Sequence, residues 1–529
     1  MKKLSQISLI LLFLLGSCTY QSAESGKPKQ IDNTYYSEQH RPQFHFTPDS
    51  MWMNDPNGLV YFEGEYHLFY QYYPEDIVWG PMHWGHAIST DLVHWEHLPI
   101  ALYPDSLGFI FSGSAIIDWK NTSGLQNGEF PPMIAIFTHH NMEGERAGSN
   151  TFQNQSIAYS NDKGRSWKKY KGNPVLRNPG IRDFRDPKVV WFEKNKKWIM
   201  VFAAHDRVMF YSSPNLTEWK KESEFGVNTG AHGGVWECPD LMPMEYNGEE
   251  KWVLLVSLNP GGPNGGSCTQ YFVGDYDGSV FTNENPGPEP LWMDYGKDNY
   301  AGVTFSDIPE EDGRRILIGW MSNWQYATSV PTERWRSAMT IPRELVLNKD
   351  EGYFELYSKP VQELDQLRDA DVQLVASVVS GSLDITDIDE FKSSMYEINL
   401  EFKLNNDSQF GMASDFGFVL SNELNEHLII GYNTSDENLY IDRTLSGKKA
   451  FSDQFPGIHR APLKIDASET LKIRAFVDKS SIELFVNDGE CVMTEIFFPN
   501  EDFDHFSLFA DNGSVKLKSG TIYSLNSTW

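Results

Sequence analysis

Three carboxylate residues are set in short motifs rich in aromatic, proline, glycine or arginine residues. Asp55 lies within Trp-Met-Asn-Asp-Pro-Asn-Gly, Asp186 within Phe-Arg-Asp-Pro, and Glu237 within Trp-Glu-Cys-Pro-Asp. Carboxylates in such surroundings do not belong to solvated runs of charge, so they are candidates for chemistry. Cleavage of a glycosidic bond requires a nucleophile, a proton donor and groups that hold the sugar hydroxyls. The three motifs therefore favour that reaction.

Each motif also has a simpler structural interpretation. Residues 54–58 form a good β-turn sequence, Arg185 and Asp186 could form a buried ion pair, and Glu237 could be a carboxylate at a rim. The neighbouring Arg185 predicts that Asp186 stays ionised, which suits binding of hydroxyl groups. An apolar pocket with nearby negative charge would raise the pKa of Glu237, as a general acid requires.

The charge balance disfavours one class of partner. The chain has 529 residues and a formal net charge of −29, which repels phosphate backbones. We therefore expect no nucleic-acid partner and a neutral or cationic ligand. The length favours two or three domains, and the 14% aromatic content supports more than one core.

The N-terminal residues have the pattern of an export signal. Met1-Lys2-Lys3 precedes the apolar run 9–15, which is too short to span a bilayer. The following Leu-Gly-Ser-Cys resembles a bacterial lipoprotein processing box, with Cys18 as the lipid-bearing residue; a plain signal peptide with an incidental cysteine is the alternative. We expect a signal peptide over 1–17, a tether over 18–37, and a lipid-anchored protein of the cell envelope, at the cell surface or the periplasmic face.

We expect no metal and no cofactor. Beyond Cys18 the chain has Cys238, Cys268 and Cys491, an odd number without the Cys-x-x-Cys spacing of zinc sites or a disulfide framework. The histidine pairs do not have the spacing of a metal site. The chain also contains no Gly-x-Ser-x-Gly elbow and no Gly-x-Gly-x-x-Gly loop, which disfavours ester hydrolysis and dinucleotide binding.

Short apolar runs recur along the first two thirds of the chain. They are centred near residues 68, 135, 200, 254 and 317, and turn residues bound each of them. A Ser-x-Asp or Ser-x-Asn turn followed by a tryptophan recurs after three of the runs. Repeats of about 60 residues with almost no helical periodicity predict a five-bladed β-propeller over 38–350. An irregular β-sandwich with coincidental spacing is the alternative.

The character of the sequence changes after about residue 344. Apolar and polar residues alternate strictly from Tyr396 to Leu404, as in a half-buried strand. The same alternation on both sides of 478–481 predicts a β-hairpin. We expect an all-β chain in which a C-terminal β-sandwich over 360–529 follows the propeller.

The motifs together resemble glycoside hydrolase family 32, the invertase, inulinase and levanase group. Trp-Met-Asn-Asp-Pro-Asn-Gly, Phe-Ser-Gly-Ser-Ala (111–115), Phe-Arg-Asp-Pro-Lys and Trp-Glu-Cys-Pro-Asp occur in the family's order. The resemblance runs from about residue 43 to the C-terminus. Later stretches such as Asn-Pro-Gly-Gly-Pro-Asn-Gly-Gly are most similar to exo-acting levanases and inulinases. The family pairs a five-bladed propeller with a β-sandwich.

The resemblance implies roles for individual residues. Asp55 corresponds to the nucleophile, Glu237 to the acid/base and Asp186 to the carboxylate that stabilises the transition state. Many relatives have tryptophan where this chain has Phe111, and Cys238 is expected to tune the environment of the acid. The positions implied to line the fructose subsite are Asn54, Gln71, Trp79, Phe111, Ser112, Arg185 and Trp320.

The implied activity is retaining hydrolysis of terminal β-D-fructofuranosyl residues from levan, inulin or sucrose by a monomeric enzyme. A retaining mechanism predicts a separation of about 5–5.5 Å between the Asp55 and Glu237 carboxyl groups. Three alternatives stay open: endo cleavage, fructosyl transfer on the same site, and a non-catalytic lipoprotein that captures fructan.

Overall fold

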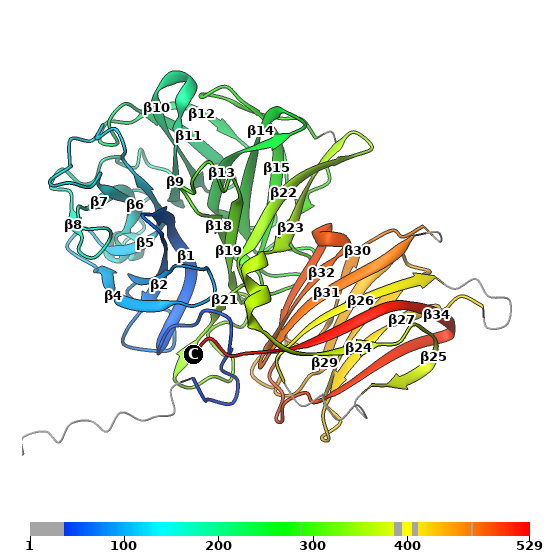
Figure 1. The fold of residues 1–529 in the computed structure, drawn as a ribbon. Helices are drawn as coiled ribbons and strands as arrows, with labels where there is room; N and C mark the ends of the chain where they lie inside the picture. The colour runs from blue at the N-terminus through cyan, green and yellow to red at the C-terminus, as the bar shows by residue number, and fades with distance from the viewer. Residues whose placement is uncertain (1–35, 286, 386–393, 405–410, 467–468) are drawn as a thin grey trace, which may run out of the picture.

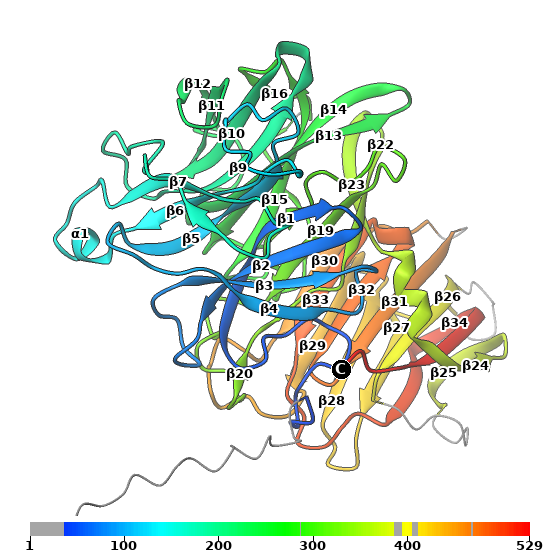
Figure 2. The ribbon, with the colours of Figure 1, turned by 60° about the vertical axis from the view of Figure 1, so that its left-hand side comes forward.

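The computed structural model describes residues 36–529 except 286, 386–393, 405–410 and 467–468. The expected signal peptide, Cys18 and most of the expected tether lie outside the described residues. Five β-sheets form a propeller, and a larger sheet system follows it (Figures 1 and 2). No helix in the described part of the chain is long and apolar enough to cross a membrane.

The first three blades are antiparallel sheets in simple chain order. The first contains β1 (Met51–Phe62), β2 (Glu65–Tyr73), β3 (His83–Ser89) and β4 (Glu96–Leu102). The second contains β5 (Phe109–Ile117), β6 (Met133–His140), β7 (Gln153–Ser160) and β8 (Lys168–Lys169), with α1 (Met142–Arg146) after β6. The third contains β9 (Phe184–Phe192), η1 (Glu193–Asn195), β10 (Lys197–Ala204), β11 (Val208–Ser213) and β12 (Lys220–Phe225).

The last two blades complete the ring. The fourth contains β13 (Val235–Tyr246), β14 (Glu249–Asn259), β15 (Cys268–Tyr276), β16 (Phe281–Asn283) and β17 (Leu291–Trp292). The fifth contains β18 (Tyr300–Thr304), β19 (Arg315–Met321), β21 (Ala338–Met339), β22 (Arg343–Asp350) and β23 (Tyr353–Pro360). The short strand β20 (Trp335–Arg336) lies between β19 and β21 in the chain but pairs in parallel with the start of β1 in the first blade. This pairing joins the last blade to the first.

The predicted propeller is confirmed, and the apolar runs occupy equivalent places in it. They are β2, β6, β10, β14 and β19, the second strand of each blade. The central residues of these strands are buried on both faces because neighbouring blades cover both sides of each sheet. The tryptophan of the recurring turn also has one role: the indole N–H groups of Trp95, Trp167 and Trp219 each donate to a carbonyl three residues earlier.

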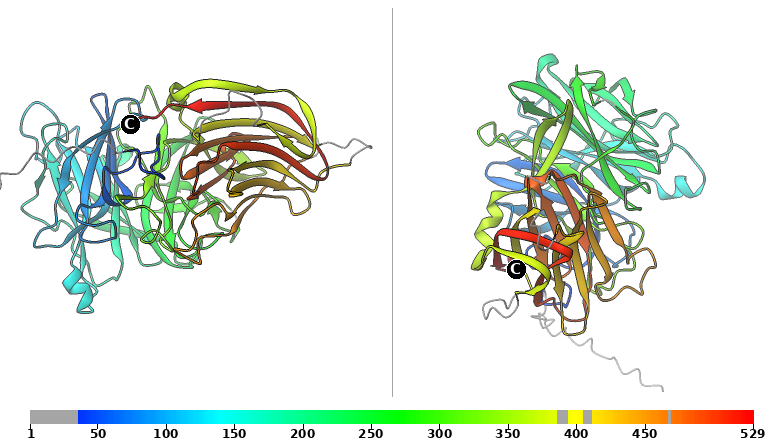
Figure 3. Two further views of the ribbon diagram at one scale, coloured as in Figure 1. Left: turned by 90° about the horizontal axis from the view of Figure 1, so that it is seen from below. Right: turned by 90° about the vertical axis from the view of Figure 1, so that its right-hand side faces the viewer.

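The C-terminal strands form the predicted β-sandwich-like unit beside the propeller (Figure 3). The expected hairpin is confirmed, because β31 pairs with β32 from Ile473 opposite Val486 to Asp478 opposite Ser481. The elements are η2 (Gln362–Leu367), β24 (Arg368–Leu374), β25 (Ser377–Asp384), β26 (Tyr396–Leu404), β27 (Asp415–Ser421), β28 (His427–Asn433), β29 (Asn438–Leu445), β30 (Ile458–Pro462), β31 (Thr470–Asp478), β32 (Ser481–Val486), η3 (Asn487–Gly489), β33 (Cys491–Ile496) and β34 (His505–Leu525).

A buried charged cluster joins the propeller to this unit. His45, which precedes β1, lies 2.8 Å from an oxygen of Asp478 and 2.9 Å from an oxygen of Glu483. Arg343 at the start of β22 also donates to Glu483. Burial disfavours the imidazolium, but the two carboxylates outweigh it and raise the pKa of His45 to about 9. The domains are therefore held together by paired charges as well as by apolar packing.

This cluster predicts a loss of stability in mild alkali. A histidine with a raised pKa stabilises the fold fully below its unfolded pKa of about 6.5, and this contribution disappears as pH rises through 9. We expect the free energy of unfolding to fall by on the order of 3 kcal/mol over that window. Chemical denaturation should show a flatter pH dependence for His45→Gln than for the parent. Equal slopes for the His45 variant and the parent would contradict the assignment.

Candidate active site

The candidate catalytic residues converge at one end of the propeller axis. Asp55, Ser112, Asp186, Glu237 and Tyr300 lie near the first residues of the inner strands β1, β5, β9, β13 and β18. Each of these strands contributes from a different blade. The radial arrangement therefore brings together residues that are up to 245 positions apart, Asp55 and Tyr300.

The ladders of all five inner strands are irregular at this level. The pairing register shifts within four of them: at 53–56 in β1, 110–113 in β5, 237–240 in β13 and 300–303 in β18. The fifth, β9, has its register shift opposite residues 201–203 of β10. Asp186 and Cys238 also have positive φ values of 64° and 44°. Bulges and left-handed residues re-aim side chains at a cost that the surrounding sheet must offset. Here they turn polar side chains toward the axis.

Asp55 is partly buried and surrounded by hydrogen-bond donors. Ser112 Oγ donates to one carboxylate oxygen at 2.6 Å, and Asn54 Nδ2 donates to the other at 3.0 Å. Burial raises the pKa of Asp55, and these donors oppose that shift by stabilising the charged form. The donors also fix the orientation of the carboxylate, as a nucleophile requires.

Cys238 contacts two carboxylates, Asp55 and Asp186. Its thiol lies 3.5 Å from Oδ2 of Asp55 and 3.7 Å from Oδ2 of Asp186, and its backbone N–H donates to Asp186 at 3.1 Å. Burial and the surrounding carboxylates raise the pKa of the thiol well above its usual value, so it remains a donor. Cys238 therefore links Asp55 to Asp186.

The arginine beside Asp186 is used differently from the expectation. The Arg185 guanidinium donates to Glu237 at 2.8 Å and to Asp183 at 2.7 Å, whereas its closest approach to Asp186 is 3.8 Å. Burial, together with the charges of Glu237 and Asp55, outweighs Arg185 and raises the pKa of Asp186 to about 7. Both side chains line the same cavity, but the hydrogen bonds of the guanidinium go to Glu237 and Asp183, so adjacency in sequence did not determine its partners.

Glu237 has polar surroundings in place of the expected apolar pocket. Arg185 donates to its Oε1 through two nitrogens, and the hydroxyl of Tyr300 donates to its Oε2. The side chain retains about a fifth of its exposure and faces the cavity. Its position is therefore fixed by two partners while one side stays open to a ligand.

These groups line a cavity of about 290 Å³. The expected Trp320 is fully buried behind the wall, where its ring packs against that of Trp324 at 4.9 Å. Trp324 takes the place expected for Trp320. Phe111 stacks on His140 with ring centroids 4.1 Å apart. The lining residues are Asn54, Asp55, Gln71, Trp79, Phe111, Ser112, His140, Glu145, Gln153, Asp183, Arg185, Asp186, Glu237 and Trp324.

Comparison with known proteins identifies the architecture and the site. Residues 45–360 match the model of the glycosyl hydrolases family 32 N-terminal domain, and residues 363–524 match that of the family's C-terminal domain. The chain belongs to glycosyl hydrolase family 32. It is a glycosidase.

Individual relatives of this family 32 glycosidase cover most of its length. A levanase from Bacillus subtilis is 49% identical over all of this chain and 76% of the relative. An extracellular exo-inulinase from Aspergillus awamori is 38% identical over 93% of this chain and 96% of the relative. The crystal structure of exo-inulinase from that organism superimposes with a TM-score of 0.84, at 36% identity, over 93% of this chain and all of that chain.

Sequence reasoning missed several residues that the glycosidase fold brings to the cavity. Tyr300 is buried and contacts Glu237, and Asp183 contacts Arg185, yet neither stands in a distinctive motif. In the sequence, His140 is half of the pair His139-His140, which lacks the spacing of a metal site. The described residues contain no group of three or more potential metal ligands.

The raised pKa of Asp186 predicts that replacing this carboxyl group stabilises the fold at neutral pH but lowers activity. A carboxyl group with a raised pKa destabilises the fold progressively as pH rises from about 4 to 7. Asp186→Asn should therefore raise the free energy of unfolding at pH 7 by on the order of 3 kcal/mol and leave it nearly unchanged at pH 4, while fructosidase activity falls. Denaturant titration at both pH values checks this.

Asp183→Asn is the matched control. Burial opposes ionisation of Asp183, but Arg185 lowers its pKa below the usual value, so removal of this charge should destabilise the enzyme. Stabilisation by both substitutions, or by neither, would contradict the assignment of the two carboxylates.

Proposed function

We propose that this family 32 glycosidase is a retaining exo-β-fructosidase that releases terminal fructose from fructans. The observation that carries the proposal is the pairing of two differently supported carboxyl groups on one cavity: Asp55, held by Ser112 and Asn54, and Glu237, held by Arg185 and Tyr300. The relatives that the chain matches are named levanase, exo-inulinase and β-fructofuranosidase, and the last was crystallised with fructosyl-erythritol. A cavity of about 290 Å³ suits one terminal sugar ring.

In the first step, Asp55 attacks the anomeric carbon C2 of the terminal fructose. Glu237 donates its proton to the leaving oxygen as the glycosidic bond breaks. Asp186 binds hydroxyl groups of the ring. Cys238 contacts the carboxylates of both Asp186 and Asp55 and so holds them at a fixed position relative to each other. In the second step, Glu237 accepts a proton from water, which displaces Asp55 and releases fructose with its configuration retained.

Product profiles distinguish this activity from related ones on the same site. The enzyme should be incubated in parallel with levan, inulin and sucrose, and the products followed with time. Fructose as the sole early product supports exo hydrolysis. Early oligosaccharides from the polymers indicate endo cleavage, and growth of oligosaccharides at high sucrose indicates transfer. Relative rates on levan and inulin give the linkage preference, and no release of sugar from any of them overturns the proposal.

A capture function without catalysis is the weaker candidate. A protein that only binds fructan has no use for a second carboxylate, held by Arg185 and Tyr300, on the same cavity as a nucleophile. Reducing-sugar release by the purified chain, together with its loss in the variants described in the Discussion, separates the two functions.

The enzyme's location follows from its N-terminal motif. We propose that the chain is exported as a monomer and held at the cell envelope through a lipid on Cys18, close to its polymeric substrate. The name of the Aspergillus awamori relative, an extracellular exo-inulinase, supports the export. Expression with a labelled fatty acid should yield a labelled protein in the membrane fraction, and Cys18→Ser should release it unlabelled.

A further inference from the structure

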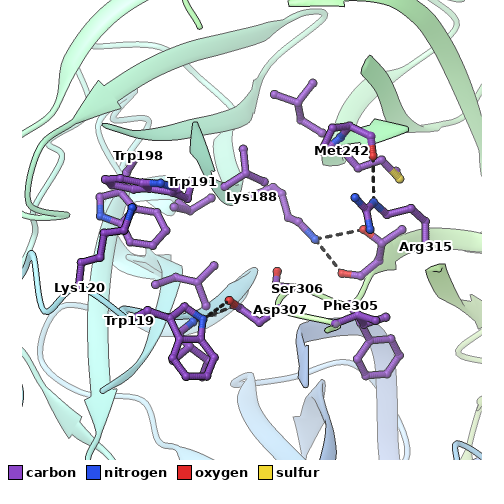
Figure 4. Close-up of a pocket in the computed structure, with 18 residues that line it drawn as sticks. Trp119, Lys120, Lys188, Trp191, Trp198, Met242, Phe305, Ser306, Asp307 and Arg315 are labelled. Atoms are coloured by element: carbon purple, nitrogen blue, oxygen red, sulfur yellow. Dashed lines mark hydrogen bonds between the residues drawn. The ribbon is translucent and has the colours of Figure 1, made fainter. Parts of the chain in front are cut away.

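A second cavity lies at the opposite end of the propeller axis from Asp55. Its walls come from the later residues of the same inner strands, such as 188–191 of β9 and 241–243 of β13, and from the segment after β18 (Figure 4). Glu237 lines the active-site cavity and Met242, five residues further along β13, lines the second cavity. The cavity has a volume of about 300 Å³, and we call it the rear cavity.

A buried ion pair separates the rear cavity from the active site. Lys188 Nζ donates to Asp240 Oδ2 at 3.1 Å and to the carbonyl of Thr304 at 2.7 Å. Lys188 lines the rear cavity, and none of the residues that line the rear cavity also lines the active-site cavity. The rear cavity is therefore not an extension of the fructose subsite.

An oriented aromatic surface lies at the rear cavity. Trp119 is 57% exposed, yet its indole N–H donates to Asp307 Oδ1 at 2.8 Å, which fixes the plane of the ring (Figure 4). Trp191 packs edge-on against Trp198 at 4.9 Å, and Lys120 lies over its face at 4.6 Å. An exposed indole held in one orientation gives a flat apolar surface on which a ring can rest.

The rear cavity is lined by a buried polar atom that lacks a partner. Ser306 Oγ is buried, and no atom in the described part of the chain forms a hydrogen bond with it. Its hydroxyl points into the cavity between Lys188 and Asp307 (Figure 4). A buried polar atom without a partner is unfavourable, so it indicates a ligand that supplies a hydroxyl group.

The charges around the rear cavity favour a neutral ligand. Lys188 is paired with Asp240, and Lys120 is paired with Glu193 at 3.0 Å. The Arg315 side chain donates to the carbonyl of Pro243 at 2.9 Å, so its charge is also partly engaged. A charged ligand would have to displace these partners, whereas a polyol with an apolar ring face would not.

We propose that the rear cavity is a second saccharide-binding site, which holds a fructan segment while the active site acts on a chain end. The inference rests on the proposed fructosidase function for the identity of the sugar. Trp119 supplies the stacking surface, and Ser306 with Asp307 supplies contacts to hydroxyl groups. A second contact on the same polymer raises the local concentration of chain ends without a change in the chemical step. Short substrates that cannot reach both sites gain nothing from it.

Binding stoichiometry tests the rear cavity directly. In the catalytically impaired Glu237→Gln background, titration calorimetry with fructan oligosaccharides of about five units, levan-type and inulin-type in separate runs, should give two sites per chain. Adding Trp119→Ala to this background should leave one site per chain. If that variant folds poorly, Ser306→Met, which fills the cavity, should have the same effect. Tyr353→Ala, which removes another exposed aromatic side chain outside the cavity, should leave both.

Kinetics of the otherwise native enzyme provide the second measurement. Trp119→Ala should raise KM for levan and inulin roughly five- to tenfold with kcat unchanged, and should leave both constants for sucrose unchanged. The inference is overturned if the Glu237→Gln protein binds one oligosaccharide per chain both with and without Trp119→Ala. It is also overturned if the protein binds a small aromatic probe such as 4-nitrophenol while the oligosaccharide stoichiometry remains at one. If the native enzyme releases no fructose from any fructan, the proposed function fails. If it does and one site is counted, only the rear site fails.

Discussion

Replacement of Asp55 by Asn should reduce fructose release by on the order of 10⁵-fold, because the amide cannot form the covalent fructosyl intermediate. The substitution keeps the shape of the side chain. It also removes a partly buried carboxylate whose pKa is raised by desolvation, so the melting temperature should not fall. The measurements are initial rates of fructose release from levan and thermal unfolding of both proteins.

A small external nucleophile tests the role of Asp55 more sharply. In Asp55→Gly, azide can enter the space that the carboxylate leaves and attack C2 of an activated fructoside from that side. The expected product is a fructosyl azide of inverted configuration, because only one displacement occurs. Residual activity within tenfold of the parent, or an azide product of retained configuration, would remove Asp55 from the role.

The second large effect is expected at Glu237. Glu237→Gln should lower turnover on unactivated fructan by roughly 10²–10⁴-fold, since the amide cannot protonate the leaving oxygen. The loss in the first step should be much smaller for 4-nitrophenyl β-D-fructofuranoside, whose leaving group needs little protonation. Parallel kinetics on the two substrates measure this dependence.

Stereochemistry again provides the contrasting control for Glu237. With the activated fructoside, azide should accelerate the second step in Glu237→Ala and yield a product of retained configuration, the opposite of the result at Asp55. Glu145→Gln is the matched variant. Glu145 lines the same cavity, but its hydrogen bond is to His140 and not to Asp55 or Glu237. Its turnover should stay within about tenfold of the parent. Equal losses on both substrates for the Glu237 variant would argue against a general acid.

The fold was predictable because its signals are local. Blade repetition appears in the sequence as apolar second strands and as a turn whose tryptophan donates back to the chain, seen at Trp95, Trp167 and Trp219. The hairpin around 478–481 was predictable for the same reason, since alternation and a turn sequence are both local properties.

The partners within the site were less predictable, because they depend on which blades face each other. Arg185 follows Phe184 and precedes Asp186 in sequence, yet its guanidinium binds Glu237 from the next blade and Asp183. Cys238 is adjacent to Glu237 and contacts Asp55 and Asp186 instead. Trp320 and Trp324 are equivalent by residue type, and only packing places the second at the cavity wall.

The sequence by itself determined an all-β propeller with a second β-domain and placed three carboxylates in motifs suited to glycoside cleavage. Periodicity, turn residues and motif order are properties of neighbouring residues, so they can be read along the chain. Tertiary structure alone decided which donors hold each carboxylate, that burial raises the pKa of Asp186 to about 7, and that a second cavity opens at the far end of the axis. These features arise from contacts between residues that are distant in sequence, because burial and charge are set by the closed ring of blades.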